Sequence, residues 1–372
     1  MADTISEHFF RFAHRRMPDK QVADYIAYTQ DEFYFQLALH KKNRIDLLRE
    51  HFSHTKVRKI IISGNLRSIG FKLEGYDIVY LEHFFFSTSD GQTLDQKIAL
   101  LEDSIVLVNN NDIAREGGMS TYAEIYSRCN TTIFAGWDWD NHHWMELSTF
   151  LAAHSDMYIP AHNENLYLLT RFNWLTAGPV HIGTVQWSKK YLSDHLPDML
   201  SIERSDSPLG KHNPYDAFRF RMQAIITLNQ HYQTIGFNDG SFHSRTDNER
   251  LREWASHKSH WVVPVLNDVP IRIFDALITG GIPIVPESLR YLPPVCNIKR
   301  EYILFYSALD ILMPEKIVAA ANELFDNGGL EKMVERHVYA LKRHHGTHAI
   351  RTIFDYIYEH FSIKLVSDIE YN

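Results

Sequence analysis

One apolar run of the sequence ends in side chains that transfer protons and bind metal ions. The stretch FAGWDWDNHHW (134–144) carries Asp138, Asp140, His142 and His143. Carboxylates and imidazoles act as general bases near neutral pH, and they also bind divalent metal ions. The cluster therefore suits either a base that deprotonates a hydroxyl group or a metal site. A third interpretation is a polar turn in which Asp140 or Asn141 caps the next helix.

The segments that must position this cluster alternate between apolar runs and helical patterns. We expect a helix over residues 20–52, and then strands within residues 56–65, 76–84, 103–112, 131–140 and 155–160, with helices at 93–102 and 119–129. This alternation predicts a parallel sheet with helices on both faces, and such sheets bind ligands beyond the carboxyl ends of their strands. We therefore expect a solvent-filled cleft at that edge, lined by Gly64, Asn65, Glu82, His83, Asn109, Asn110, Asn111, Asp112, Asp138 and Asp140.

A second series of strands and helices follows residue 178. Strands are expected within residues 180–187, 231–239, 260–268, 281–288 and 300–307, and two polar segments, 207–216 and 236–248, are expected to be loops. Because 372 residues exceed the usual size of one hydrophobic core, two domains are the default. The chain is expected to end in a long helical tail.

Bulk composition narrows the class of protein. The net charge of −8 argues against a nucleic-acid partner or an anionic membrane surface, since both require dense Lys and Arg. Two cysteines, Cys129 and Cys296, cannot form a disulfide framework, which favours a reduced cytoplasmic setting. We expect no signal peptide and no membrane-spanning segment, because no stretch has the required apolar length. Gly64, Asn65 and Gly70 miss the dinucleotide-binding glycine spacing, so a nicotinamide enzyme is not expected.

The stretch NDVPIRIFDALITGGIPIVP (267–286) carries a second pattern of interest. Asn267 or Asp268 can cap a helix, and Pro270 fits its first turn. The helix would end at Gly280 and Gly281, because glycine adopts the left-handed conformation at low cost. Its apolar face would consist of Ile273, Phe274, Leu277 and Ile278. A buried strand follows.

The run RIFDALITGGIPIV (272–285) resembles the donor-binding motif of GT-B glycosyltransferases, particularly the group-1-like enzymes. The resemblance implies that Asp275 holds the ribose of a nucleotide sugar and that Arg272 faces its diphosphate. Many retaining members have two glutamates spaced by seven residues. Here Asn267 stands at the earlier position and Asp268 lies one step off, so the stereochemical outcome stays open.

The resemblance extends the donor site to other residues of the second half. Lys189 and Lys258 are candidates for phosphate or base contacts, with ordinary surface lysines as the alternative interpretation. The complete set of expected donor-binding residues is Gly183, Lys189, Lys258, Asn267, Asp268, Arg272, Asp275, Gly280 and Gly281.

Taken with the resemblance, the sequence predicts an α/β protein with two Rossmann-like domains facing across a cleft. Residues 1–178 would form the acceptor-side domain and residues 179–345 the nucleotide-sugar domain, while the helix within 346–372 would pack back on the first. The implied activity is hexosyl transfer from a nucleotide-diphosphate sugar to a glycan, lipid-linked or protein acceptor, in bacterial surface polysaccharide or glycoconjugate synthesis. No cofactor or metal is expected, and the catalytic candidates are Asp138, Asp140, His142 and His143.

Two other functions compete with this prediction. One is a metal-dependent enzyme, either GT-A-like or a hydrolase, in which the four catalytic candidates bind the ion. The other is a non-catalytic binding protein that keeps only the fold.

Overall fold

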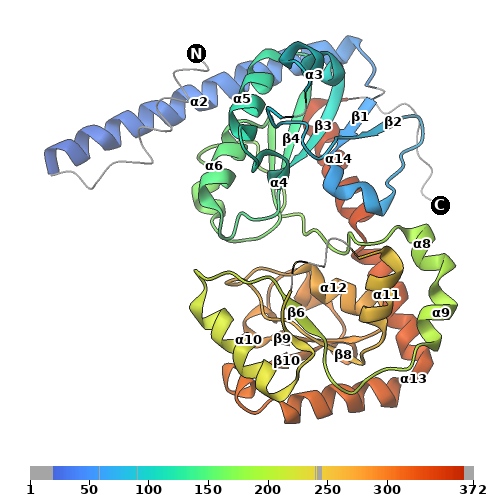
Figure 1. Ribbon diagram of the computed structural model, residues 1–372. Coiled ribbons are helices and arrows are strands. Elements are labelled where there is room, and N and C mark those ends of the chain that lie inside the picture. Colours follow the sequence, from blue (N-terminus) through green and yellow to red (C-terminus); the bar gives the residue numbers. More distant parts are fainter. Residues whose placement is uncertain (1–19, 58, 90, 239, 241–244, 364–372) are drawn as a thin grey trace. The chain divides into compact units, whose positions relative to one another are not determined.

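The computed structural model describes residues 20–57, 59–89, 91–238, 240 and 245–363, and the chain divides into two compact units (Figure 1). Unit 1 comprises residues 1–67, 71–180 and 352–372, and unit 2 comprises residues 68–70 and 181–351. The chain thus passes between units after Val180 and after Arg351, where the sequence prediction placed domain boundaries after 178 and 345. Residues 1–19, which bear on the signal-peptide prediction, lie outside the described residues.

Unit 1 is built on a parallel five-stranded sheet with the order β2-β1-β3-β4-β5. In the register, Ile60 lies opposite both Ile78 and Ile105. Buried Ile, Val and Leu fill β1 and β3, as expected for strands covered on both faces. The five predicted strands are confirmed as β1 (Lys59–Ile62), β2 (Asp77–Tyr80), β3 (Ser104–Asn109), β4 (Ile133–Asp138) and β5 (Met157–Pro160).

Helices cover the sheet of unit 1. One face packs Val106, Val108 and Phe134 against side chains of α3, α5 and α6. The long first helix, α2, is tied to the sheet by Arg44, which forms a buried ion pair with Asp156 at 2.6 Å. The helices of this unit are α2 (Lys20–His54), α3 (Leu94–Leu101), α4 (Asn110–Ile113), α5 (Gly118–Arg128), α6 (Met145–Ala153) and α7 (Leu166–Leu169), and η1 (Gly64–Ile69) runs from unit 1 into unit 2.

Unit 2 repeats the strand order of unit 1. A three-stranded sheet (β10-β9-β8) and a two-stranded sheet (β6-β7) are joined by a parallel bridge between Leu209 and His260. Numbered along the chain within each unit, both units therefore have the doubly wound order 2-1-3-4-5. The strands are β6 (Gly210–His212), β7 (Ile235–Phe237), β8 (Ser259–Trp261), β9 (Ile282–Pro286) and β10 (Leu304–Tyr306). The protein is therefore an α/β protein with two Rossmann-like units. That they face across a cleft stays a prediction.

Two sequence predictions in unit 2 are wrong. Residues 180–187 form no strand, because Gly183 adopts a left-handed conformation (φ +68°) and only Thr184 pairs, with the loop at His345. Conversely, the polar segment 207–216 contains β6, whose backbone pairs with β7 from Gly210 to His212. Burial of this strand under its neighbours outweighs its polar composition.

Helix α12 (Ile271–Ile278) agrees with the sequence at its end and differs at its start. It ends as predicted, with Gly280 at φ +78°. At the start, Pro270 is the N-cap and no side chain caps the helix. Asp268 instead accepts a hydrogen bond from the backbone N–H of Val265 at 2.6 Å, so its carboxylate closes the preceding loop.

The other helices of unit 2 surround the sheet formed by strands β6–β10 (Figure 1). They are α8 (Lys189–Asp194), α9 (Leu196–Ser201), α10 (Arg219–His231), α11 (Asp247–Ala255) and α13 (Glu315–Arg343), with short turns η3 (Glu287–Leu289), η4 (Val295–Asn297), η5 (Arg300–Tyr302) and η6 (Ala308–Ile311). The last helix, α14 (Gly346–Phe361), enters unit 1 at Thr352, where Phe354 stacks on Phe71. None of the helices in the described ranges is both long and apolar enough to span a bilayer.

Candidate functional site

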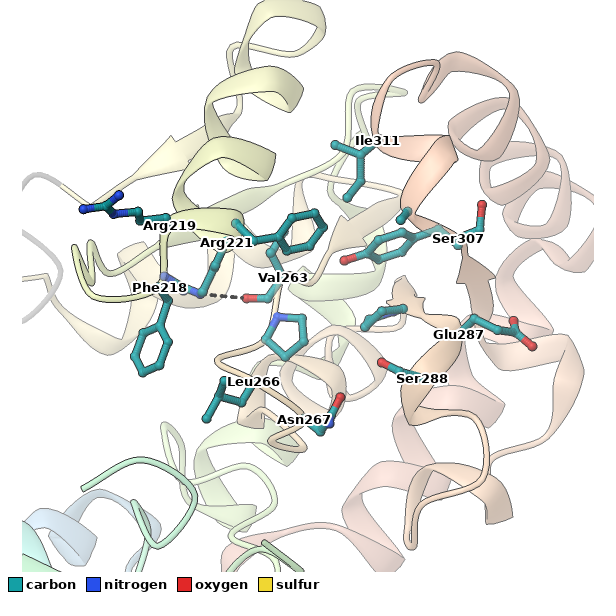
Figure 2. A pocket seen from close by; sticks show the side chains of 15 residues that line it. Phe218, Arg219, Arg221, Val263, Leu266, Asn267, Glu287, Ser288, Ser307 and Ile311 are labelled. Carbon is teal, nitrogen blue, oxygen red and sulfur yellow. Dashed lines mark hydrogen bonds between the residues drawn. The ribbon is translucent and has the colours of Figure 1, made fainter. Parts of the chain in front are cut away.

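A cavity of about 550 Å³ opens at the carboxyl edge of the unit 2 sheet (Figure 2). Its walls come from the start of α10 and from the segments that follow β8, β9 and β10. The lining residues are Phe218, Arg219, Phe220, Arg221, Val263, Pro264, Leu266, Asn267, Pro286, Glu287, Ser288, Tyr306, Ser307, Ala308 and Ile311. Doubly wound sheets bind their ligands at this edge, and small-molecule sites have this volume and this mostly apolar lining with a few polar groups.

Backbone carbonyls at the floor of the cavity are already hydrogen-bonded. Arg221 donates from Nε to the carbonyl oxygen of Val263 at 3.2 Å, as Figure 2 shows, and Tyr306 donates its hydroxyl proton to Val262 O at 3.0 Å. The floor is therefore rigid. Glu287 lies at the exposed rim, where Arg290 donates from Nη2 to Oε2 at 2.7 Å and its Nε lies 2.7 Å from Oε1 as an ion pair.

Two arginines of unit 2 bear on the cavity, Arg221 in its lining and Arg272 in α12. Arg221 and Arg272 both lower the pKa of buried His212, although burial is the larger cause. Burial also lowers the pKa of Arg272 itself to about 10, and Asp275 acts in the opposite direction. Within the described ranges Arg272 forms no hydrogen bond and no ion pair. This part of unit 2 is therefore suited to an anionic ligand group.

Asp275, the predicted ribose ligand, is fully buried in α12. Its Oδ1 accepts from Thr184 Oγ1 at 2.6 Å and its Oδ2 from Gln186 Nε2 at 2.5 Å. Burial raises its pKa to about 6, against these two hydrogen bonds and the Arg272 charge. Asp275 does not line the cavity, and a ligand would reach it only if residues 184–186 moved. We therefore assign it to holding that segment and not to the ribose.

Three predicted donor residues lie at the amino edge of the unit 2 sheet, opposite the cavity. Lys258 precedes β8 and forms ion pairs with Asp206 at 2.6 Å and Asp326 at 2.8 Å. Gly280 and Gly281 form the turn from α12 into β9, where a Cβ on Gly281 would lie 2.6 Å from His260 Nε2. The geometry gives all three a structural task and brings none of them to the cavity.

Gly183 and Lys189 also lie apart from the cavity lining. Gly183 lies against the carbonyl oxygen of His344, so that a Cβ there would overlap it. Lys189 is exposed at the start of α8, and its Nζ lies 3.1 Å from His348 Nε2. Of the nine predicted donor residues, only Asn267 lines the cavity, while Asp268 and Arg272 lie in the adjoining loop and helix.

In unit 1 the polar residues after β3 and β4 form a buried network and not the solvent-filled cleft that we expected. Asn109, Asn110 and Asp138 are fully buried. Asn109 donates to the carbonyl oxygen of Trp137 at 3.0 Å, and Asn110 accepts from the backbone N–H of Trp139 at 2.9 Å. These side chains satisfy one another, so they fix the loop that follows β4.

Asp138 is a structural member of this network. Its Oδ2 accepts from the Tyr158 hydroxyl at 2.7 Å and its Oδ1 from the Asp140 N–H at 3.0 Å. Burial raises its pKa to about 6. Because the side chain is fully buried and both oxygens are engaged, Asp138 is poorly placed to meet a substrate.

The other three catalytic candidates lie together. Asp140, His142 and His143 each offer a ligand atom, and these atoms all lie within 4.8 Å of one another. His143 Nδ1 lies 3.0 Å from His142 Nε2. Burial, followed by His162 and His143, lowers the pKa of His142 to about 2, and burial also lowers that of His143. Neither Asp140 nor Asn141 caps α6, which begins after Trp144 without a side-chain cap.

Several cavity residues were missed at the sequence level. Glu287 and Ser307 are the first polar residues after the apolar runs IPIVP and ILFY. In the first half of the chain, polar residues just after apolar runs are the candidates for a ligand site. The same criterion identifies Glu287 and Ser307 in the second half. Arg221 lies in the first turn of α10, where a helical pattern alone shows no function.

Comparison with known proteins adds little. No protein-family model matches the chain, and none of the curated proteins matches it. A solved structure named "OtsA apo structure" has 11% sequence identity and a TM-score of 0.46, covering 83% of this chain and 100% of that chain. A likeness of this size carries no argument, so the fold rests on the strand order described above.

Proposed function

We propose that the protein is a glycosyltransferase that binds a nucleotide-diphosphate sugar in the cavity of unit 2. The observation that carries the proposal is the cavity itself, which lies at the carboxyl edge of a doubly wound parallel sheet and has Arg219 and Arg221 in its lining. The GT-B resemblance of residues 272–285 supports the same ligand class.

Each part of such a donor has a chemical counterpart around the cavity. Phe218, Tyr306 and Leu266 offer apolar and aromatic surface for a base. Glu287 offers carboxylate oxygens to sugar or ribose hydroxyls, a charge-assisted contact, and takes over the role predicted for Asp275. Arg219 and Arg221 lie in the first turn of α10, whose unpaired N–H groups favour a diphosphate.

The acceptor hydroxyl must lose a proton as it attacks the sugar. We assign this step to the cluster of Asp140, His142 and His143 in unit 1, since Asp138 is committed to the buried network. For the acceptor we keep the classes that the GT-B resemblance implies: a glycan, a lipid-linked sugar or a protein.

A cavity-filling substitution tests donor binding. Ala308 is exposed and lines the cavity, so Ala308→Trp should fill it without disturbing the core. Leu309→Trp is the matched control, because Leu309 is 71% exposed and does not line it. Calorimetry with UDP, GDP and CMP and their sugars should give binding of one nucleotide series, with affinity at least about tenfold weaker in Ala308→Trp and unchanged in the control. Absence of heat with every nucleotide, or equal affinity in both variants, would overturn the proposal.

A further inference from the structure

The cluster of Asp140, His142 and His143 combines two imidazoles with one carboxylate. Their ligand atoms lie within 4.8 Å of one another, with 3.0 Å between His143 Nδ1 and His142 Nε2. In a tetrahedral zinc site with bonds near 2.0–2.1 Å, ligand atoms are about 3.3 Å apart. The cluster is therefore close to the spacing that a metal ion requires, and small side-chain rotations bring the ligands to it.

The loop that carries the two histidines is held in place before any ion binds. Asn141 donates to the carbonyl oxygens of His162 and Glu164 at 2.9 and 2.8 Å, and it accepts from the His162 N–H at 2.9 Å. Asn165 donates to the carbonyl oxygen of Asn141 at 2.9 Å. These bonds fasten residues 141–143 to the loop that follows β5, so ordering the ligands costs little on binding.

The carboxylate has the hydrogen bond that metal-binding carboxylates usually have. Asn110 Nδ2 donates to Asp140 Oδ2 at 2.6 Å, and Asn111 Nδ2 approaches the same oxygen at 3.5 Å. Over the described part of the chain Oδ1 accepts no hydrogen bond, which leaves it for an ion. Second-shell bonds of this kind orient a metal ligand and tune it.

The donor set selects the class of ion. Imidazole nitrogen suits zinc, iron, cobalt and nickel, whereas calcium and magnesium prefer oxygen ligands throughout. Three protein ligands also leave a coordination position for water or for a substrate hydroxyl, as in catalytic zinc sites. Asp140 and His143 are both partly exposed, which gives that position access to solvent.

We infer that Asp140, His142 and His143 form a binding site for a divalent transition-metal ion, with zinc as the representative ion. The inference stands on unit 1 alone and departs from the expectation that no metal is required. An ion here would lower the pKa of a coordinated water or hydroxyl group. That would supply the base for acceptor activation if the proposed function holds.

Direct metal binding tests the site without any assay of activity. The full-length protein is stripped with a chelator, dialysed, and titrated with Zn²⁺ by calorimetry, with metal content measured by mass spectrometry. A Cys296→Ser background removes the exposed thiol, because thiolates are also metal ligands. One zinc ion per chain is expected to be retained.

Variants locate the site. His143→Gln and Asp140→Asn should each weaken zinc binding by at least about 100-fold, more than loss of a second-shell partner does. His51→Gln is the matched control, because His51 pairs with Asp103 at 3.0 Å outside the cluster and should bind zinc like the parent protein. Circular dichroism checks that each variant folds. Zinc binding that is absent in the parent, or unchanged in both folded cluster variants, would overturn the inference.

Discussion

Replacement of Asp275 by Asn tests whether this carboxylate has a structural role and whether its burial destabilises the charged form. The side chain is fully buried and accepts from Thr184 and Gln186. Asn keeps an oxygen for Thr184, and Gln186 can turn its amide so that Oε1, which is buried without a hydrogen-bond partner, accepts from the new NH₂ group. The substitution therefore removes the charge while keeping the packing.

The magnitude follows from the pKa of Asp275, which burial raises from 3.8 to about 6. A shift of about two units corresponds to about 3 kcal/mol. Well below pH 3.8 the group is protonated in both the folded and the unfolded chain and costs nothing. As pH rises from 4 to 6 the unfolded chain releases its proton first, so the folded protein loses stability until the native group also ionises. Above about pH 7 the loss is complete and constant.

Asp275→Asn has no such group, so its stability relative to the parent protein should rise by about 3 kcal/mol between about pH 2.5 and pH 7. Urea unfolding at one-unit steps of pH, followed by circular dichroism, measures the difference. Other titrating groups cancel in the comparison. Asp46→Asn is a control of opposite sign, because the hydrogen bond from Lys42 lowers the pKa of Asp46. Its relative stability should fall as pH rises.

A flat difference curve for Asp275→Asn would show that burial does not control this group. A falling curve would mean that Arg272 and the two hydrogen bonds outweigh burial and that the native carboxylate prefers its charge. With either result, Asp275 would again be a candidate for a carboxylate that contacts the ligand.

Two further substitutions test how the loops are held. Gly183→Ala should destabilise the protein by about 2–4 kcal/mol, because the backbone is left-handed (φ +68°) and the Cβ would overlap His344 O. Gly91→Ala is the control: its backbone is also left-handed (φ +76°) but its Cβ would meet open space, so it should cost only about 1 kcal/mol. Thermal unfolding midpoints measure both. Asn141→Ala should cost about 3 kcal/mol because it removes the partner of two buried backbone groups of His162 and of the part-buried Glu164 carbonyl. Exposed Asn163→Ala should have little effect. Equal midpoints within either pair would contradict the geometry.

The sequence predicts most of the fold because the strands are buried on both faces and read as apolar runs. Eight of the ten strands in the described residues lie within predicted runs, and β8 begins one residue before its run. The tenth, β6, is a short polar stretch whose pairing depends on neighbours far along the chain, and a single sequence does not display that. For the same reason the apolar run at residues 180–187 was wrongly predicted as a strand. Its conformation depends on the left-handed Gly183 and on one bridge between Thr184 and His345.

The candidate site was harder to predict than the fold. Sequence spacing grouped Asp140, His142 and His143, and their ligand atoms lie within 4.8 Å of one another because a tight turn keeps near neighbours close in space. It failed to separate them from Asp138, whose two carboxylate oxygens are both held in the buried network. In unit 2 the motif drew attention to α12, whereas the cavity is lined by residues from the ends of three strands and the start of α10. Such a lining exists only once the strand order is known.

The shared order 2-1-3-4-5 explains where each unit holds its polar groups but not what they do. In unit 1, Asn and Asp follow β3 and β4 and bond to one another, so the carboxyl edge is filled from within. In unit 2 the segment after β8 is the apolar VVPVL, and its carbonyls are taken by Arg221 and Tyr306. Space remains there because the local side chains are too apolar to close the edge with hydrogen bonds. A ligand-sized cavity with arginines in its lining and a cluster of side chains of the metal-binding type are thus two outcomes of one topology, separated by the few residues that follow each strand.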